Sequence, residues 1–202
     1  MAPKIALDID DVLANSTETI RLFVNKLRGT SLERHHYSIK APYRSYYETV
    51  WSAHDIDGDG IIDEYYHKLI IDQSHVETIM GASDAIGSLI NLGYRLVAVS
   101  SRSSDQQVAT EKWIKGMFGD VFDTVICLDS WRNNITKGEI CRSLGANYLI
   151  DDNVEHCKSA LDYGVQPILF GEYGWQTGEL VPEEVARCPD WESVLGYFNG
   201  RD

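Results

Sequence analysis

Five short, almost continuously apolar segments constrain the fold of this chain more than any other feature. They are residues 4–9, 94–99, 123–128, 147–150 and 166–170. A strand with one face in water alternates apolar and polar residues, whereas a strand covered on both faces is apolar throughout. The five segments therefore predict the strands of a parallel sheet with helices on both of its faces.

Helical patterns lie between these segments. After Asn15 and Glu18, which suit the start of a helix, apolar residues recur every three or four positions: Ile20, Phe23, Val24 and Leu27. Residues 83–93 and residues 136–145, which begin with Thr136 as a cap, repeat this pattern, and each ends at or near a glycine. The alternation of strand and helix predicts an α/β fold, with a doubly wound, Rossmann-like parallel sheet.

One stretch interrupts the alternation. Between the first helix and residue 83, about fifty residues contain no strand of this type, and a structureless loop of that length is improbable in a compact domain. We expect this stretch to form helices of its own, such as residues 64–71. The chain is thus predicted to have an α/β core of residues 1–15 and 82–202, with a mainly helical cap of residues 16–81 inserted into it.

Polar residues gather where the predicted strands end. In an open parallel sheet, ligands bind outside the carboxyl ends of the strands. The residues at this edge are Asp8, Asp10, Asp11, Ser100, Ser101, Arg102, Lys137, Asp151 and Asp152. Several carboxylates at one point repel each other unless a cation lies among them, and oxygen ligands suit Mg²⁺, which also binds phosphate oxygens. The sequence therefore predicts a magnesium and phosphate site.

These residues resemble the signatures of the haloacid dehalogenase (HAD) superfamily. Its four signatures are matched in order and spacing by IALDIDDVLANS, VAVSSR, Lys137 and YLIDDN. The resemblance covers the core and not the cap. The placement of a cap between the first and second signatures resembles that in the helical-cap members of the superfamily. These include the 5'(3')-deoxyribonucleotidases and phosphatases of small sugars or hydroxyacids.

The resemblance implies a phosphatase that works through an aspartyl phosphate. Asp8 would be the nucleophile, and Asp10 would protonate the leaving oxygen and then deprotonate water. Ser100 would donate a hydrogen bond to the phosphoryl group, and Lys137 would neutralise its charge. The aspartate at position 10 favours phosphatase over dehalogenase chemistry. Magnesium would be held by Asp8, Asp10, Asp151 and Asp152.

Substrate contacts are predicted near the second strand and in the cap. Ser101 and Arg102 are candidate substrate-binding residues, although a surface role suits Arg102 equally well. In the cap, aromatic and basic side chains suit a base and a phosphate: Tyr43, Tyr46, Tyr47, Trp51, Lys40 and Arg44. The alternative is that these aromatic residues form the small core of the cap. A small phosphomonoester is the expected substrate, with nucleoside monophosphates the best single candidate.

A second metal site is predicted inside the cap. The segment DIDGDGIID matches the first nine positions of a calcium loop, with candidate ligands Asp55, Asp57, Asp59 and Asp63. Position twelve should be a bidentate acid and is Tyr66. A solvated acidic turn stabilised by glycines is the alternative to a Ca²⁺ site.

Bulk properties exclude some classes of partner. A net charge of −13, from 31 acidic and 18 basic residues, opposes binding to duplex nucleic acid. The apolar runs are too short to span a membrane, so no membrane association is predicted. Four scattered cysteines without a signal-peptide pattern favour a reducing, cytoplasmic location. Two other functions remain open: a non-catalytic phosphate-binding or regulatory protein, and a calcium-binding interaction module.

Overall fold

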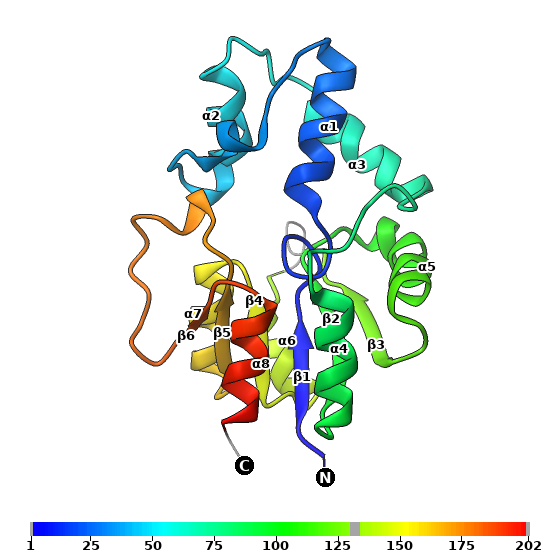
Figure 1. The fold of residues 1–202 in the computed structure, drawn as a ribbon, viewed down its shortest axis with the longest axis vertical. Helices are drawn as coiled ribbons and strands as arrows, with labels where there is room; N and C mark the ends of the chain where they lie inside the picture. Colours follow the sequence, from blue (N-terminus) through cyan, green and yellow to red (C-terminus); the bar gives the residue numbers. More distant parts are fainter. Residues whose placement is uncertain (1, 130–133, 201–202) are drawn as a thin grey trace.

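A computed structural model describes residues 2–129 and 134–200 (Figure 1). Within these residues the chain forms a sheet of six parallel strands in the order β3-β2-β1-β4-β5-β6. The strands are β1 (Lys4–Leu7), β2 (Arg95–Ser100), β3 (Phe122–Cys127), β4 (Tyr148–Asp151), β5 (Gln166–Phe170) and β6 (Ala186–Cys188). The chain winds outward from β1 in both directions, which confirms the predicted doubly wound α/β fold.

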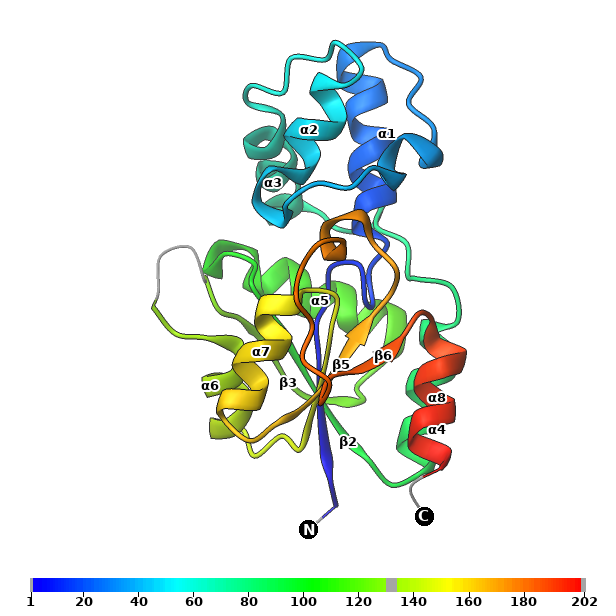
Figure 2. The ribbon, with the colours of Figure 1, turned by 90° about the vertical axis from the view of Figure 1, so that its left-hand side faces the viewer.

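Helices cover both faces of this sheet. Figure 2 shows α6 (Lys137–Ser143) and α7 (Val154–Asp162) on one face, with α4 (Ala82–Asn91) and α8 (Trp191–Asn199) on the other. Helix α5 (Gln107–Phe118) lies beside β3. In β1, Ile5 and Leu7 pack into one apolar cluster and Ala6 into another, and all three are fully buried. Burial on both faces explains why the strands are almost continuously apolar in sequence.

Two strands differ from the sequence prediction. Strand β1 ends at Leu7 rather than at Ile9, so the aspartates that follow lie in a loop. Strand β6 was not predicted, because three residues at the edge of a sheet are too short to give a pattern. The remaining four strands begin or end within a few residues of their predicted positions.

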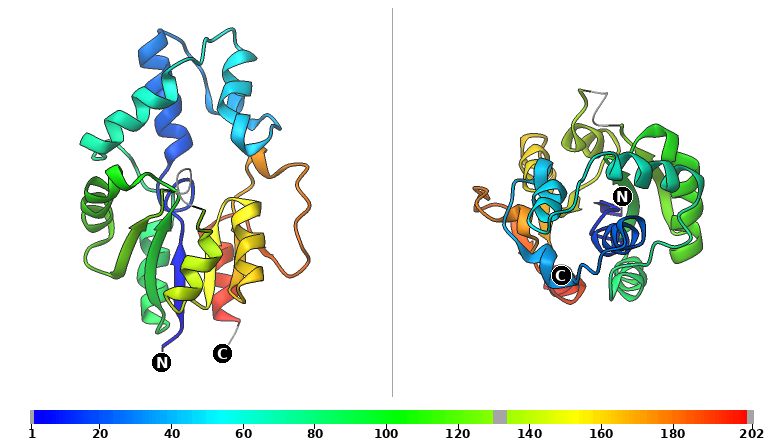
Figure 3. Two further views of the ribbon diagram at one scale, coloured as in Figure 1. Left: turned by 180° about the vertical axis from the view of Figure 1, so that it is seen from behind. Right: turned by 90° about the horizontal axis from the view of Figure 1, so that it is seen from above.

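The part of the chain from residue 16 to residue 71, between β1 and β2, lies beyond the carboxyl ends of the strands (Figures 1 and 3). It contains α1 (Ser16–Arg28), α2 (Tyr46–Ser52) and α3 (Ile61–Ile71), with short 3-10 turns η1 (Arg34–Ser38) and η2 (Tyr43–Ser45). Two further turns, η3 (Ser104–Gln106) and η4 (Gly174–Gln176), belong to the segments after β2 and β5. The division into a core and a cap at residues 15/16 and 81/82 stays a prediction.

Helix boundaries follow the local sequence with one exception. Thr136 caps α6 as predicted, because its hydroxyl accepts the N–H of Glu139 at 3.2 Å. Gly29 ends α1 in the left-handed region at φ 67°. Asn15, however, makes no capping hydrogen bond, and Glu18 binds Arg21 instead of reaching back to the helix start.

The aromatic residues of the cap divide into buried and exposed groups. Trp51 and Tyr46 are 0% and 2% exposed, and both donate hydrogen bonds to Tyr37, through the Trp51 indole and the Tyr46 hydroxyl. They form the core of the cap, which was the alternative to base stacking for these two residues. Tyr43 and Tyr66 remain 43% and 44% exposed. No helix among the described residues is long and apolar enough to cross a membrane.

Candidate active site

A cleft of about 1240 Å³ separates the carboxyl ends of the strands from the cap. Its floor comes from the loops after β1, β2 and β4, and its roof from η2, α2 and α3. The floor includes Asp10, Ser101, Arg102, Asp152 and His156. The roof carries Tyr43, Tyr47, Tyr65 and Tyr66. Predicted site residues from distant parts of the sequence therefore meet at one cleft.

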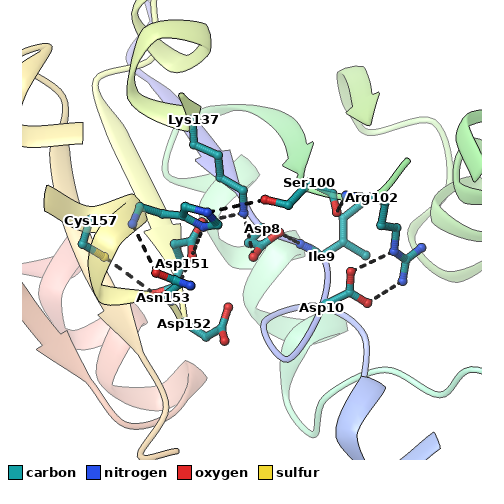
Figure 4. A network of polar contacts seen from close by, with 12 residues as sticks. Asp8, Ile9, Asp10, Ser100, Arg102, Lys137, Asp151, Asp152, Asn153 and Cys157 are labelled. Atoms are coloured by element: carbon teal, nitrogen blue, oxygen red, sulfur yellow. Dashed lines mark hydrogen bonds and ion pairs between the residues drawn. The ribbon is translucent and has the colours of Figure 1, made fainter. Parts of the chain in front are cut away.

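Lys137 bridges two carboxylates beside this cleft (Figure 4). Its ammonium nitrogen lies 2.7 Å from Asp8 Oδ2 and 2.7 Å from Asp151 Oδ2, and its side chain is 1% exposed. Burial acts to lower the pKa of Lys137, but the charges of Asp151 and Asp8 outweigh it and raise the pKa. Lys137 is the first residue of α6, so the start of this helix delivers a fixed positive charge to the ends of β1 and β4.

The two carboxylates on Lys137 differ in how firmly they hold a negative charge. Burial raises the pKa of Asp8 to about 6, although Lys137 opposes this shift. For Asp151, burial also acts upward, but Lys137 and His156 hold its pKa at about 2. Asp8 additionally accepts the N–H of Ile9 at 2.7 Å. Asp151 is thus the counter-ion of Lys137 that stays ionised, while the negative charge on Asp8 is stabilised less.

Asp10 pairs with a different cation. Nε and Nη2 of Arg102 donate to its two carboxylate oxygens at 2.8 Å each, and the Ser16 hydroxyl also donates to it. Burial acts to raise the pKa of Asp10, but Arg102 and Ser16 together lower it. The prediction of a surface role for Arg102 is wrong, since its side chain is only 4% exposed.

Asp152 is a candidate metal ligand because its buried carboxylate lies among other negative charges. It is 3% exposed, and the indole of Trp175 donates to its Oδ2 at 2.9 Å. Within the described residues it has no ion pair. Burial and then the charges of Asp151, Asp8 and Asp11 raise its pKa well above the usual range. A buried carboxylate surrounded by other carboxylates is the donor set that a hard divalent cation such as Mg²⁺ requires.

One set of ligand atoms among the described residues lies close together, and Asp152 does not belong to it. Oxygen and nitrogen atoms of Asp8, Asp151 and His156 fall within 4.8 Å of one another. Lys137 already places its ammonium between Asp8 and Asp151, so a divalent ion at the same point would be repelled. We therefore favour Asp8 and Asp152 as the carboxylate ligands of a metal. The Asp10 carboxylate is taken by Arg102, which leaves its backbone carbonyl for this role.

The serines after β2 occupy distinct positions. Ser100 is 1% exposed, and its hydroxyl accepts the N–H of Arg102 at 3.2 Å. The Ser101 hydroxyl lies 3.5 Å from Nε2 of His156, whose Nδ1 is 3.1 Å from Asp151 Oδ1. Ser100 therefore sits under the site, and Ser101 sits at its edge.

His156 was not predicted from the sequence. Asn153 caps α7 by accepting the N–H groups of Glu155 and His156 at 2.8 and 3.3 Å. This cap places the first turn of α7 next to the end of β4, and so turns His156 toward Asp151. An asparagine directly after the YLIDD segment was the signal for such a helix start.

The predicted calcium loop gains no support. Asp55, Asp57 and Asp59 are exposed, and Asp57 Oδ1 accepts the N–H of Asp59 at 3.1 Å. Asp63 already lies in the first turn of α3. Across residues 2–129 and 134–200, these aspartates do not belong to any group of three or more ligands close enough to share an ion. The turn is stabilised by its own hydrogen bonds.

Comparison with known proteins addresses the fold. No family model matches the chain, and no curated protein matches its sequence. Solved structures match it over nearly its full length. A HAD hydrolase from Bacillus subtilis bound to magnesium has 13% identity, with 98% of each chain covered and a TM-score of 0.65. A predicted phosphoglycolate phosphatase from Haemophilus somnus has 15% identity, with 96% of each chain covered and a TM-score of 0.62.

A third similar structure contains a phosphorylated sugar. It is a mutant of the protein CbbY from Rhodobacter sphaeroides in complex with xylulose-1,5-bisphosphate. The identity is 14%, with 95% of each chain covered and a TM-score of 0.57. Identities at this level establish similarity of fold and not of substrate. The strand order, the cap above the strand ends and these structural matches together identify the chain as having the fold of the HAD-superfamily hydrolases.

Proposed function

We propose that the chain is a magnesium-dependent phosphomonoester hydrolase that forms an aspartyl phosphate on Asp8. The observation that carries this proposal is the buried Lys137, whose ammonium lies 2.7 Å from both Asp8 and Asp151 beside the cleft. A nucleophilic carboxylate must approach a negatively charged phosphoryl group. A fixed cation beside it offsets that repulsion and stabilises charge in the transition state.

Such a reaction has two halves, and Asp8 takes part in both. In the first half, an Asp8 oxygen forms a bond to phosphorus, the bond to the leaving oxygen breaks, and that oxygen takes up a proton from solvent. The ion pair with Arg102 lowers the pKa of Asp10 and so opposes its predicted role as the acid in this step. In the second half, water attacks the phosphorus, gives its proton to Asp10, and releases phosphate from Asp8. Arg102 keeps Asp10 ionised in the resting enzyme, which suits its role as a base toward water.

Magnesium would be held by the carboxylates of Asp8 and Asp152 and by the backbone of Asp10. When bound, it neutralises charge on the phosphoryl oxygens and on the nucleophile. The raised pKa values of Asp8 and Asp152 support this assignment, because each marks a carboxylate that lacks sufficient positive charge around it. Asp151 contributes by holding Lys137 and His156 in place.

The roof of the cleft suits a neutral leaving group with aromatic or hydroxyl character. Tyr43 and Tyr66 present exposed rings, and Gln106 on the floor has a buried Oε1 atom without a hydrogen-bond partner in the described part of the chain. An ordered water or a ligand can supply the donor that such an acceptor lacks. Arg44 is the basic residue of the roof, and it is accompanied by Glu48, Asp59 and Asp63. Nucleoside monophosphates combine a π-face, N–H donors and a single phosphate, and they remain our preferred substrate class.

A substrate panel tests the proposal directly. Nucleoside monophosphates, sugar phosphates, phosphoglycolate and p-nitrophenyl phosphate are each assayed for phosphate release, with Mg²⁺ and with a chelator. We expect turnover with magnesium, none with chelator, and a gain of one phosphoryl group on the peptide containing Asp8 when the reaction is quenched. Inactivity toward the whole panel would favour a phosphate-binding protein without turnover.

A further inference from the structure

Arg102 makes more hydrogen bonds than any substrate-binding role requires. Nε and Nη2 donate to Asp10 at 2.8 Å each, and Nη1 donates to Gln73 Oε1 at 2.8 Å and to Thr110 Oγ1 at 3.1 Å. An arginine carries five N–H donors, so these four bonds leave a single donor for anything else. The side chain is 4% exposed, whereas that of Asp10 is 36% exposed. Arg102 therefore lies behind Asp10, and Asp10 is the group that faces the cleft.

The pair formed by Arg102 and Asp10 is contacted from both connections between the cap and the core. Gln73 follows α3, the last helix of the cap, and its own amide donates to Leu69 and Thr110 at 3.0 and 3.1 Å. On the other connection, Ser16 at the start of α1 donates to Asp10. Gln73 is 3% exposed. The Asp10 carboxylate is thus held by groups whose positions depend on where the cap lies.

The geometry of a paired guanidinium and carboxylate is restrictive. Two parallel N–H···O bonds fix both the position and the plane of the carboxylate, which a single hydrogen bond would not do. Proton transfer to water needs an acceptor oxygen within hydrogen-bond reach, and a displacement of about 1 Å can cost roughly a hundredfold in rate. A residue that fixes Asp10 therefore controls the step that Asp10 performs.

We propose that Arg102 is a positioning residue: together with Gln73 and Ser16 it holds the Asp10 carboxylate for proton transfer and couples its position to the cap. This inference rests on the proposed function, since it assigns Arg102 a part in that same reaction. It replaces the prediction that Arg102 binds substrate. Arg102 acts through Asp10 and does not itself contact the reacting atoms.

A double-mutant cycle separates this role from a structural or substrate-binding one. Variants Arg102→Met and Asp10→Asn, alone and combined, are reacted with p-nitrophenyl phosphate and Mg²⁺ in single-turnover experiments. Nitrophenol release reports phosphorylation of Asp8, and the loss of phosphoryl mass from the Asp8 peptide reports its hydrolysis. We expect Arg102→Met to slow hydrolysis roughly tenfold to a hundredfold, with little change in the KM. In the Asp10→Asn background, the same substitution should have no further effect.

The chain contains a matched control. Arg21 also donates from Nε and Nη2 to one carboxylate, that of Glu18, at 2.8 and 2.7 Å, but it lies outside the cleft. Arg21→Met should leave both rates unchanged. If Arg102→Met fails to fold, Gln73→Met removes one of the bonds that orient Arg102, and it should slow hydrolysis a few-fold only where Asp10 is present.

The outcomes are distinguishable. An equal loss from Arg102→Met or Gln73→Met in the presence and absence of Asp10 would overturn the inference, because the residue would then act independently of Asp10. A raised KM as the main effect would return Arg102 to substrate binding. Absence of phosphate release by the wild-type protein would instead contradict the proposed function itself.

Discussion

The floor and the roof of the cleft are built on opposite physical principles. On the floor and beside it, charged side chains are matched one to another: Arg102 with Asp10, and Lys137 with Asp8 and Asp151. On the roof, tyrosine side chains line the cleft beside exposed charged residues such as Arg44, Glu48 and Asp63. Buried charges tolerate little displacement, since an unpaired one costs several kcal/mol, whereas aromatic surfaces accept ligands of varied shape. Under the proposed function, this difference assigns the chemistry to the floor and selection of the leaving group to the roof.

The first prediction tests the floor. Asp8→Asn should abolish phosphate release, a loss of roughly a thousandfold or more, because an amide cannot form the acyl phosphate. Asp84→Asn, on the exposed first turn of α4, is the matched control and should behave as the wild type. Phosphate release with several substrates measures both. If the Asp8→Asn protein, freed of contaminating phosphatase, kept a tenth of the activity, another residue would be the nucleophile.

The second prediction concerns the cation of the floor. Lys137→Met leaves Asp8 and Asp151 buried and facing each other without their ammonium. We expect a loss of about 3–5 kcal/mol in the free energy of unfolding at neutral pH, and a loss of turnover of roughly a hundredfold. Lys158→Met, which breaks only solvent-accessible pairs with Glu155 and Glu179, should change neither. A stable Lys137→Met protein with normal turnover would show that the floor does not depend on charge matching.

The third prediction uses pH to measure the excess negative charge on the floor. Burial raises the pKa of Asp8 to about 6 and that of Asp11 to about 7, above the value of about 3.9 for an unfolded aspartate. Between about pH 4 and pH 7 the folded chain therefore binds more protons than the unfolded chain, so stability without metal should fall as pH rises. Asp10 and Asp151, whose pKa values are lowered, act in the opposite direction below about pH 4.

Magnesium should reverse this loss. At a hundred times its Kd, Mg²⁺ adds about 2.7 kcal/mol, which corresponds to a rise in Tm of roughly 5 °C or more for a chain of this size. We expect a clear shift between Mg²⁺ and chelator at pH 7.5, and a much smaller shift at pH 5. Asp152→Asn should remove most of it. Equal shifts at both pH values, or an unchanged shift in Asp152→Asn, would mean that the ion binds elsewhere.

The floor and the roof of the cleft also differ in how much of each could be predicted from the sequence. Asp8, Lys137 and Asp151 were placed together from the sequence because each follows a strand of a parallel sheet, and such strands all end at one edge. Arg102 was placed at this edge as well, but its pairing with Asp10 was not predictable in this way. Arg102 is 92 positions away, and its burial depends on Gln73 and Thr110, which no local pattern marks.

The roof was harder to predict for a different reason. Composition identified its aromatic residues but not their exposure, because that depends on how η1, α2 and α3 pack against one another. Trp51 was a candidate for base stacking, and it lies fully buried with its indole bonded to Tyr37. In the sequence, Tyr66 was noted only because it stands at position twelve of the possible calcium loop, where an acid is required. In the structure it lines the cleft.

The fourth prediction separates these two aromatic groups. If the roof selects the leaving group, Tyr66→Ala should raise the KM for nucleoside monophosphates by about tenfold, since stacking on a base contributes about 1–3 kcal/mol. The KM for methyl phosphate, which has no ring to stack, should hardly change. Trp51→Ala is the matched contrast, because it empties the core of the cap and should cost about 3–5 kcal/mol of stability. It should therefore impair both substrates together and lower the Tm. Equal effects of Tyr66→Ala on the two substrates, with an unchanged Tm, would remove Tyr66 from recognition of the base and assign it to closing the cleft against water.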